Sequence, residues 1–176
     1  MRVLKPPSPL PEGLSQGHEP SIFLAGSIEM GRAARWQDEL IEHLSDLSAL
    51  ALNPRRDAWD ASWAQTTGNP EFVAQVEWEL AALEAATVIA MYLYPETLAP
   101  ISLLELGLFA RSGRMIVCCP DGFHRKGNVE VVCRRYGVLT VGSLELLASA
   151  VRSSLAARQG VVDGDSRMLS MCWRAL

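Results

Sequence analysis

The sequence lacks the segments that mark membrane, secreted and nucleic-acid-binding proteins. No apolar run approaches the roughly 20 residues that a membrane-spanning helix needs, and the opening residues, MRVLKPP, contain no apolar stretch typical of a signal peptide. Acidic and basic residues are interspersed, with a formal net charge of -4 and no basic stripe. We therefore expect a cytoplasmic protein that binds neither a membrane nor a nucleic-acid polymer.

Patterns that bind metals, form disulfides or bind nucleotide cofactors are also missing. The four cysteines form no C-x-x-C pair, two of them are adjacent in an apolar run, and the three histidines are scattered. Such spacing favours buried, reduced thiols over a zinc site or a disulfide framework. The glycines form neither a G-x-G-x-x-G fingerprint nor a P-loop. We expect no metal and no cofactor.

The remaining composition is that of one globular domain. The chain has 176 residues, 49% of them hydrophobic and 20% charged. Residues 1–20 contain five prolines and are expected to form a flexible, extended arm. Residues 158–176 include several apolar side chains, so we expect this tail to dock on its own domain or on a neighbouring subunit. The domain itself is predicted to span residues 21–157.

Within that domain, short β-rich runs alternate with helical patterns. The expected strands are Ser21–Ala25, Ala49–Leu52, Thr87–Tyr94, Met115–Cys119 and Val138–Val141, and the expected helices lie near 33–47, 70–86, 102–112, 127–136 and 143–157. This alternation predicts a parallel sheet covered on both faces. Right-handed crossovers favour a flavodoxin-like, Rossmann-like three-layer α/β sandwich with five parallel strands in the order 2-1-3-4-5.

The predicted strand order also locates the ligand site. Sheets of this kind bind ligands at their carboxyl edge, where the order reverses between the first and third strands. The loops there cover residues 26–31 and 94–102, and residues 53–60 follow the second strand at the same edge. The last segment can bind a polar planar ligand through hydrogen bonds and stacking, or can be a solvated loop with local ion pairs. The candidate ligand contacts are Gly26, Ser27, Asn53, Arg55, Asp60 and Ser102.

Glu105 is the leading candidate for chemistry. It lies in SLLELGLF, a helical segment that is apolar nearly all round and is therefore predicted to be buried. A buried carboxylate is costly unless it is paired or functional, and in a first helical turn the backbone dipoles would keep it ionised. Ser102-x-x-Glu105 also matches a capping box, in which Glu105 would only close the helix. The position after the third strand favours chemistry.

A second acid, Glu79, falls on the predicted inward face of helix 70–86, in line with Phe72, Val76 and Leu83. Acidic residues are rare on such a face. Glu79 therefore either takes part in function or forms a buried ion pair with an arginine.

Together these residues resemble the nucleoside 2-deoxyribosyltransferase family and its N-glycosidase relatives, over most of residues 21–141. The matching segments are IFLAGS (22–27), LELG (104–107), and GNV (127–129) ahead of YGV (136–138). By this resemblance, Glu105 is the catalytic glutamate and Glu79 occupies the position of a base-contacting aspartate. Asn128 corresponds to an asparagine that reaches into a neighbouring subunit's pocket, which implies a homodimer or higher homo-oligomer with shared active sites.

The resemblance implies an enzyme acting on a small nucleoside or nucleotide by double displacement. Glu105 would attack the anomeric carbon and expel the base, and water or an acceptor base would then resolve the glycosyl ester. N-glycosidase (hydrolase) and transferase activity both remain open. A catalytically silent nucleotide-sensing module is the alternative. A flavodoxin-like redox or interaction domain would need a cofactor loop, which the sequence lacks.

Two departures from the family pattern affect the chemistry. The transferases carry an aspartate six residues before the nucleophile, where this chain has Ala99. The acid that protonates the leaving base is therefore expected among Glu79, Asp57 and Asp60.

The second departure concerns phosphate. The relatives that cleave monophosphates carry an arginine where this chain has Glu29, and a phosphate-binding serine where it has Ala99. A free nucleoside therefore fits better than a 5′-monophosphate, unless Arg55 or Arg56 supplies the missing contacts.

Overall fold

The structure is a computed structural model that describes residues 1–28, 33–56 and 63–162. Within these ranges, six strands form one sheet in the order β1-β3-β2-β4-β5-β6, and every adjacent pair is parallel. The strands are β1 (Arg2–Leu4), β2 (Ser21–Gly26), β3 (Leu50–Leu52), β4 (Val88–Tyr92), β5 (Met115–Cys118) and β6 (Leu139–Val141).

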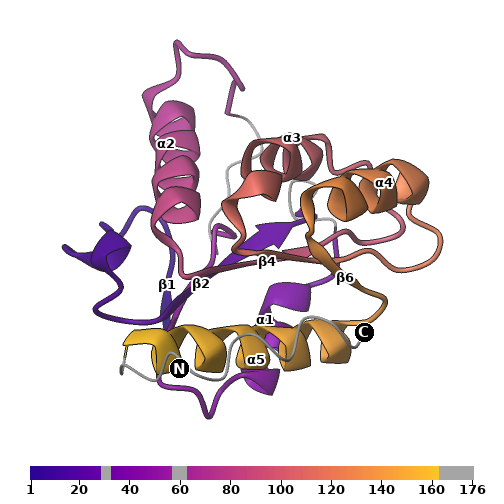
Figure 1. Ribbon diagram of the computed structural model, residues 1–176. Helices are drawn as coiled ribbons and strands as arrows, with labels where there is room; N and C mark the ends of the chain where they lie inside the picture. Colours follow the sequence, from indigo (N-terminus) through magenta and orange to yellow (C-terminus); the bar gives the residue numbers. More distant parts are fainter. Residues whose placement is uncertain (29–32, 57–62, 163–176) are drawn as a thin grey trace.

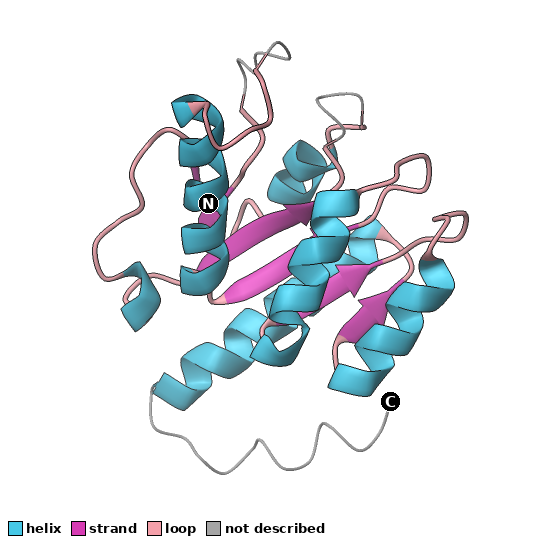
Figure 2. Cartoon of the chain, turned by 90° about the horizontal axis from the view of Figure 1, so that it is seen from above, coloured by secondary structure: helices cyan, strands magenta, loops and turns pink. Residues whose placement is uncertain are grey.

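Helices cover both faces of the sheet (Figure 1). One face carries α2 (Pro70–Ala85), α3 (Pro100–Phe109) and α4 (Lys126–Tyr136), and the other carries α1 (Trp36–His43) and α5 (Leu144–Val162). Short 3-10 turns lie at η1 (Leu14–Gln16) and η3 (Ala110–Ser112). Figure 2 shows the strands side by side in a single sheet. The three-layer α/β class predicted from the sequence is confirmed.

The central strands hold the two cores together. In β2, Phe23 packs in the core beneath α2, α3 and α4, whereas Ile22 and Leu24 pack in the core beneath α1 and α5. All three side chains are at most 1% exposed. Successive side chains of a strand point to opposite faces, so a strand covered on both sides must be apolar throughout. That requirement explains the uninterrupted run IFLA.

The predicted order of the five strands is confirmed, but the predicted number of strands is wrong. β3-β2-β4-β5-β6 corresponds to the expected order 2-1-3-4-5. The sixth strand, β1, comes from the N-terminal segment that is predicted above to be a flexible arm, and it pairs with β3 so that Val3 lies opposite Ala51. A three-residue strand is too short to produce a periodic pattern. Prolines at positions 6 and 7 lack the N–H groups that would extend it.

The rest of the N-terminal segment also contacts the domain. Leu14 is 4% exposed and belongs to the core beneath α2, α3 and α4, and Leu4 and Leu10 pack against that core. The indole Nε1 of Trp78 donates a 2.8 Å hydrogen bond to the backbone oxygen of Ser8. These contacts hold the segment against the edge of the sheet and α2.

The C-terminal helix runs further than expected. α5 ends at Val162, five residues beyond the predicted domain boundary at 157. The remainder of the tail, 163–176, lies outside the described residues, so its docking stays a prediction. None of the helices in the described part of the chain has the length and apolar character needed to cross a membrane.

Gly26 should be essential for the junction of β2 with β4. Its φ is 134°, and a Cβ atom at this position would lie 2.2 Å from the backbone oxygen of Tyr92. We expect Gly26→Ala to lower the free energy of unfolding by well over about 1 kcal/mol, measured by chemical denaturation. Gly107→Ala is the matched control. Gly107 lies inside α3, where an added Cβ would meet nothing within 4 Å. Gly107→Ala should therefore raise the free energy of unfolding by roughly 0.5–1 kcal/mol. Equal stability of Gly26→Ala and the wild type would contradict the close approach.

Candidate active site

The loops that follow β2 and β4 are joined by side-chain hydroxyl groups. The Thr97 hydroxyl donates its single hydrogen to the backbone oxygen of Tyr94 at 2.8 Å. In the 2.6 Å bond between the Ser27 and Thr97 hydroxyls, Ser27 Oγ is therefore the donor. Ser27 Oγ in turn accepts a hydrogen bond from the Tyr94 amide at 3.0 Å, and the indole of Trp36 donates to the Ser27 backbone oxygen at 2.9 Å. Ser27, a predicted ligand contact, thus lies at the predicted edge with its hydroxyl engaged in the protein.

α3 begins earlier than the sequence pattern predicts. Its N-cap is Ala99, in the left-handed conformation with φ 45° and ψ 49°, and Pro100 is its first residue. Proline is favoured at this position because its missing N–H has no helical partner there. Ser102 is therefore the third residue of the helix, and Glu105 lies in the second turn. The predicted first-turn position of Glu105 and the alternative capping box are both wrong.

α3 is also less buried than predicted. Ser102, Glu105 and Leu106 are buried, but Leu98, Ile101, Leu104 and Leu108 are 66%, 60%, 59% and 58% exposed. A segment that is apolar all round was expected to be covered all round. Instead, Leu98 just before the helix and Ile101, Leu104 and Leu108 on one side of it remain uncovered in the single chain. We refer to these four residues as the α3 apolar face.

Glu105 and Glu79 form an electrostatically coupled pair of acids on neighbouring helices. Glu105 on α3 is 8% exposed, and Glu79 on α2 is half-buried. Burial, reinforced by the negative charge of Glu79, raises the pKa of Glu105 from 4.5 to about 8. Burial also raises the pKa of Glu79, but a hydrogen bond from Gln75 and the positive charge of Arg56 oppose that rise. The Gln75 hydrogen bond and the charge of Arg56 therefore favour negative charge on Glu79 over negative charge on Glu105.

Gln75 links the acid pair to the loop after β3. Its Nε2 donates to Glu79 Oε1 at 2.6 Å and to the backbone oxygen of Pro54 at 3.0 Å, and its Oε1 accepts a hydrogen bond from Arg56 Nε. The Arg56 guanidinium also lies over the ring of Trp63, 5.1 Å from its centroid. A direct ion pair between Glu79 and an arginine is one of the two alternatives predicted above. In the described part of the chain, Gln75 stands between the two charges.

Asn53 and Arg55 organise the same edge of the sheet from β3 to α1. Asn53 Oδ1 accepts from the Arg55 amide at 3.0 Å, and the Arg55 guanidinium donates to the backbone oxygens of Ala33 and Ala34 at 3.1 and 3.0 Å. It also donates to Gln37 Oε1 at 3.4 Å. Burial is the main cause that lowers the pKa of Arg55. Asn53 Nδ2 and Gln37 Nε2 are buried, and neither has a hydrogen-bond partner among the described residues.

Asn128 is exposed on α4 and lines a hollow of about 320 Å³ between α3 and α4. Leu103 and Gly107 line the same hollow. Each is two residues from Glu105, about 160° away around a helix of 3.6 residues per turn. Leu106, which also lines the hollow, is about 100° away from Glu105. The hollow beside Asn128 therefore lies on a different side of α3 from Glu105.

The other predicted site residues are placed as follows. Gly26 ends β2 and Ser102 is buried in the first turn of α3, both at the carboxyl edge of the sheet. Asp57, Asp60 and Glu29 lie outside the described residues, so the roles predicted for the two aspartates stay predictions.

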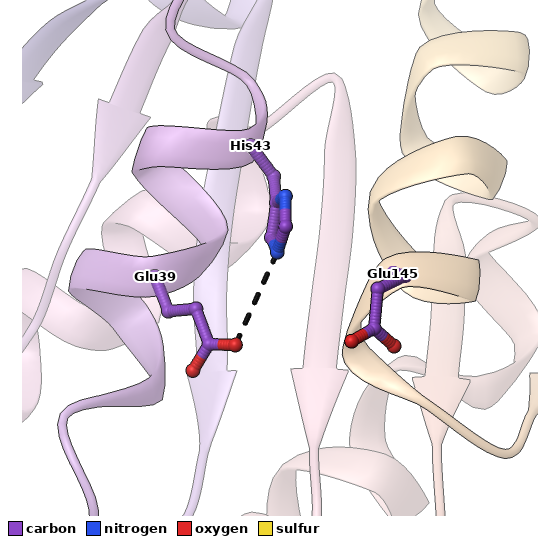
Figure 3. A group of neighbouring side chains, drawn as sticks. All are labelled: Glu39, His43 and Glu145. Carbon is purple, nitrogen blue, oxygen red and sulfur yellow. Dashed lines mark ion pairs between the residues drawn. The ribbon is translucent and has the colours of Figure 1, made fainter.

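A separate group of charged side chains lies on the other face of the sheet. Glu39 and His43 on α1 and Glu145 on α5 have ligand atoms within 4.8 Å of one another, a spacing that can hold a metal ion, but all three are exposed (Figure 3). Glu39 and His43 are 4.0 Å apart, as in an ordinary i,i+4 pair. This group is not part of the site around Glu105.

Sequence reasoning missed Gln75 and Thr97, because neither is charged. Gln75 precedes Glu79 by four residues and so shares its face of α2. That spacing was the available signal. Thr97 gave no comparable signal, because its bond to Ser27 joins loops 70 residues apart.

Comparisons with known proteins agree with this architecture. A family model described as "Nucleoside 2-deoxyribosyltransferase like" matches residues 19–123, more than half of the chain. The match confirms the resemblance found in the sequence and ends before Asn128. A crystal structure of a conserved protein from Enterococcus faecalis V583 matches with a TM-score of 0.56 and 15% identity, over 77% of this chain and 98% of that one. That structure supports the fold alone. None of the curated protein sequences matches significantly.

The raised pKa of Glu105 predicts a pH-dependent stability. The folded protein binds this proton more tightly than the unfolded chain, so stability should fall as pH rises from about 4.5 to about 8 and then level off. Glu105→Gln removes this effect. Its unfolding free energy relative to wild type should therefore increase by roughly 1 kcal/mol per pH unit between pH 5 and 8.

Glu145→Gln is the control for this measurement. A hydrogen bond from Ser143 is the main cause that lowers the pKa of Glu145. The stability that the Glu145 carboxylate contributes is complete above the ordinary glutamate pKa and is lost only as the pH falls below that value. The charge of His43 is the smallest of the causes that act on Glu145, so denaturant titrations should show a difference from wild type that varies far less between pH 5 and 8 than that of Glu105→Gln. An equally flat difference for Glu105→Gln would mean that Glu105 is ordinarily solvated.

Proposed function

Since the chain belongs to the nucleoside 2-deoxyribosyltransferase-like family, we propose that it cleaves or exchanges the N-glycosidic bond of a nucleoside-like substrate with Glu105 as nucleophile. The observation that carries this proposal is the coupled pair of acids, buried Glu105 and half-buried Glu79, at the edge of the sheet where such folds bind ligands. Perturbed carboxyl groups of this kind are concentrated at functional sites.

A single proton held between the two acids would suit a displacement at the anomeric carbon. In the reactive arrangement this proton has passed from Glu105 to Glu79, so that Glu105 is ionised and Glu79 is neutral. As a Glu105 oxygen bonds to the anomeric carbon, the bond to the base nitrogen breaks and its electron pair stays on the nitrogen, which takes the proton from Glu79. The products are a glycosyl ester on Glu105 and a Glu79 carboxylate, so the charge of the pair is unchanged.

The second half of the reaction reverses the proton movement. Water or an acceptor base attacks the anomeric carbon, the ester bond breaks towards Glu105, and the proton of the attacking group passes to Glu79. Hydrolysis and transfer differ only in which nucleophile reaches the ester. A free nucleoside remains the favoured substrate class, because Ala99 and Glu29 stand where the monophosphate-cleaving relatives carry phosphate contacts.

Glu105→Gln should abolish turnover while preserving the fold. The amide has nearly the same shape but cannot form the ester, so base release should fall by roughly 10³-fold or more. Chromatography of ribo- and deoxyribonucleosides and their monophosphates, incubated with and without an acceptor base, measures this. Near-normal release by a folded Glu105→Gln protein would remove Glu105 from the mechanism. Nucleoside binding by the wild type without any release would support the silent sensor instead.

The glycosyl ester itself can be trapped. A 2-fluoro sugar nucleoside slows breakdown of the ester, so the intact mass should rise by one fluorinated sugar, mapping by peptide analysis to Glu105. Glu105→Gln should give no adduct under the same conditions. Base release by the wild type without an adduct would indicate direct attack by water, with Glu105 acting as a base.

The site is proposed to be completed by a second copy of the chain. Two observations support this assembly: the α3 apolar face is uncovered, and the hollow that Asn128 lines lies on a different side of α3 from Glu105 of the same chain. Contiguous exposed apolar side chains of this kind mark interaction surfaces. The chain that packs on this face would bring its Asn128 to the sugar beside Glu105.

Mixing inactive variants tests the shared site. Glu105→Ala and Asn128→Ala should each be nearly inactive, and subunit exchange between them should restore activity in roughly one quarter of the pockets of a dimer. Leu108→Lys places a charge on the α3 apolar face and should dissociate the assembly in analytical ultracentrifugation. Leu146→Lys, an equally drastic change at a 55% exposed leucine of α5, should leave it intact. An active monomer, or no complementation after proven exchange, would disprove the shared site.

A further inference from the structure

The amide of Gln75 can adopt only one orientation. The backbone oxygen of Pro54 can only accept a hydrogen bond, and Arg56 Nε can only donate one. Gln75 Nε2 must therefore face Pro54, and its remaining N–H points at Glu79 Oε1, 2.6 Å away. Gln75 is 3% exposed, so water does not compete for these bonds. The loop after β3 thus fixes which group is presented to Glu79.

This orientation makes the two oxygens of Glu79 inequivalent. Oε1 receives an N–H group and serves best as an unprotonated acceptor, which leaves Oε2 to carry the proton of the neutral acid. The charged groups that act on Glu79 are Arg56, from the loop after β3, and Glu105, from α3. When Glu79 loses its proton, the new charge is already held by the Gln75 N–H and the field of Arg56.

We propose that Gln75 is a positioning residue that, held by Arg56 and Pro54, keeps the transferable proton of Glu79 on Oε2 and so makes Glu79 the acid for the leaving base. This inference rests on the proposed glycosyl transfer and specifies its proton donor. The proton leaves Oε2 for the base nitrogen as the glycosidic bond breaks, and the carboxylate that remains accepts the hydrogen bond from Gln75. Water or the acceptor base returns the proton to Oε2 in the second step.

The first test is independent of turnover. In protein labelled with ¹³C at the glutamate carboxyl carbons, Gln75→Leu should raise the apparent pKa of Glu79 and lower that of Glu105. Without the Gln75 hydrogen bond Glu79 stays neutral to higher pH and no longer opposes ionisation of its neighbour. Gln37→Leu makes the same change at a buried glutamine on the opposite face of the sheet, and should leave both titrations unchanged. Unshifted titrations in a folded Gln75→Leu protein would overturn the proposal.

A second variant covers the case in which Gln75→Leu fails to fold. Arg56 is only half-buried, and Arg56→Met removes both the donor that fixes the Gln75 amide and the positive charge near Glu79. Like Gln75→Leu, it should raise the apparent pKa of Glu79 and lower that of Glu105. Unshifted titrations in this variant would equally overturn the proposal.

The third readout is the dependence of kcat/KM on the leaving base. Glu79→Gln should lower kcat/KM by roughly 10²–10⁴-fold for strongly basic leaving groups and only slightly for weakly basic ones. Gln75→Leu should show the same dependence on the leaving group, with a loss of about tenfold for the strongly basic ones. A loss that is equal for all leaving groups would indicate a merely structural role for Gln75. Shifted titrations without base release from any nucleoside would refute the proposed function and leave the control of Glu79 by Gln75 standing.

Discussion

The repulsion between two neighbouring carboxyl groups, those of Glu105 and Glu79, makes it costly to ionise both, and this constraint determines how the protein is organised around them. Glu105 and Glu79 come from different helices, so α2 and α3 must be held side by side on the same face of the sheet for the pair to exist. The buried strands beneath them provide that support, through side chains such as Phe23 that pack under both helices. The cost of burying the acids is offset in part by Gln75 and Arg56, which stabilise charge on Glu79 alone. The asymmetry between two chemically identical groups therefore originates in the loop after β3.

The position of Glu105 also depends on a strained helix start. Ala99 adopts a left-handed conformation that costs a non-glycine residue about 1–2 kcal/mol. Pro100 then begins the first turn. In the helix that follows, Ser102 and Glu105 lie on the inward side, whereas Ile101, Leu104 and Leu108 are exposed. Ala99 stands where the related transferases carry an aspartate, so this chain has backbone strain where its relatives have a second carboxylate. Glu79 is the acid within the described residues that is coupled to Glu105.

The sequence predicted the sheet order, because long-range order in such folds follows from local patterns. It also drew attention to Glu105 and Glu79, whose catalytic roles stay predictions. Uninterrupted apolar runs identify strands that are covered on both faces, and acids on inward helical faces are rare enough to be noticed. Three features escaped prediction for physical reasons. β1 has only three residues, so its pairing with β3 is decided by tertiary contact. The uncovered side of α3 is as apolar as its buried side, so periodicity does not distinguish them. Gln75 shares a helix face with Glu79, but its bonds to Pro54 and Arg56 come from a loop that is distant in the sequence.

The hydroxyl pair of Ser27 and Thr97 has a consequence for ligand recognition. It joins the ends of two neighbouring strands through bonds that are complete in the protein alone, and Trp36 holds the same loop from the opposite layer. Ser27 and Thr97 are thus held in place by the protein itself. A ligand bound against these two residues would lose little affinity to ordering them, so small differences in its shape would translate directly into differences in binding. Selectivity at this edge would then come from the rigidity of the protein as much as from the number of contacts it offers.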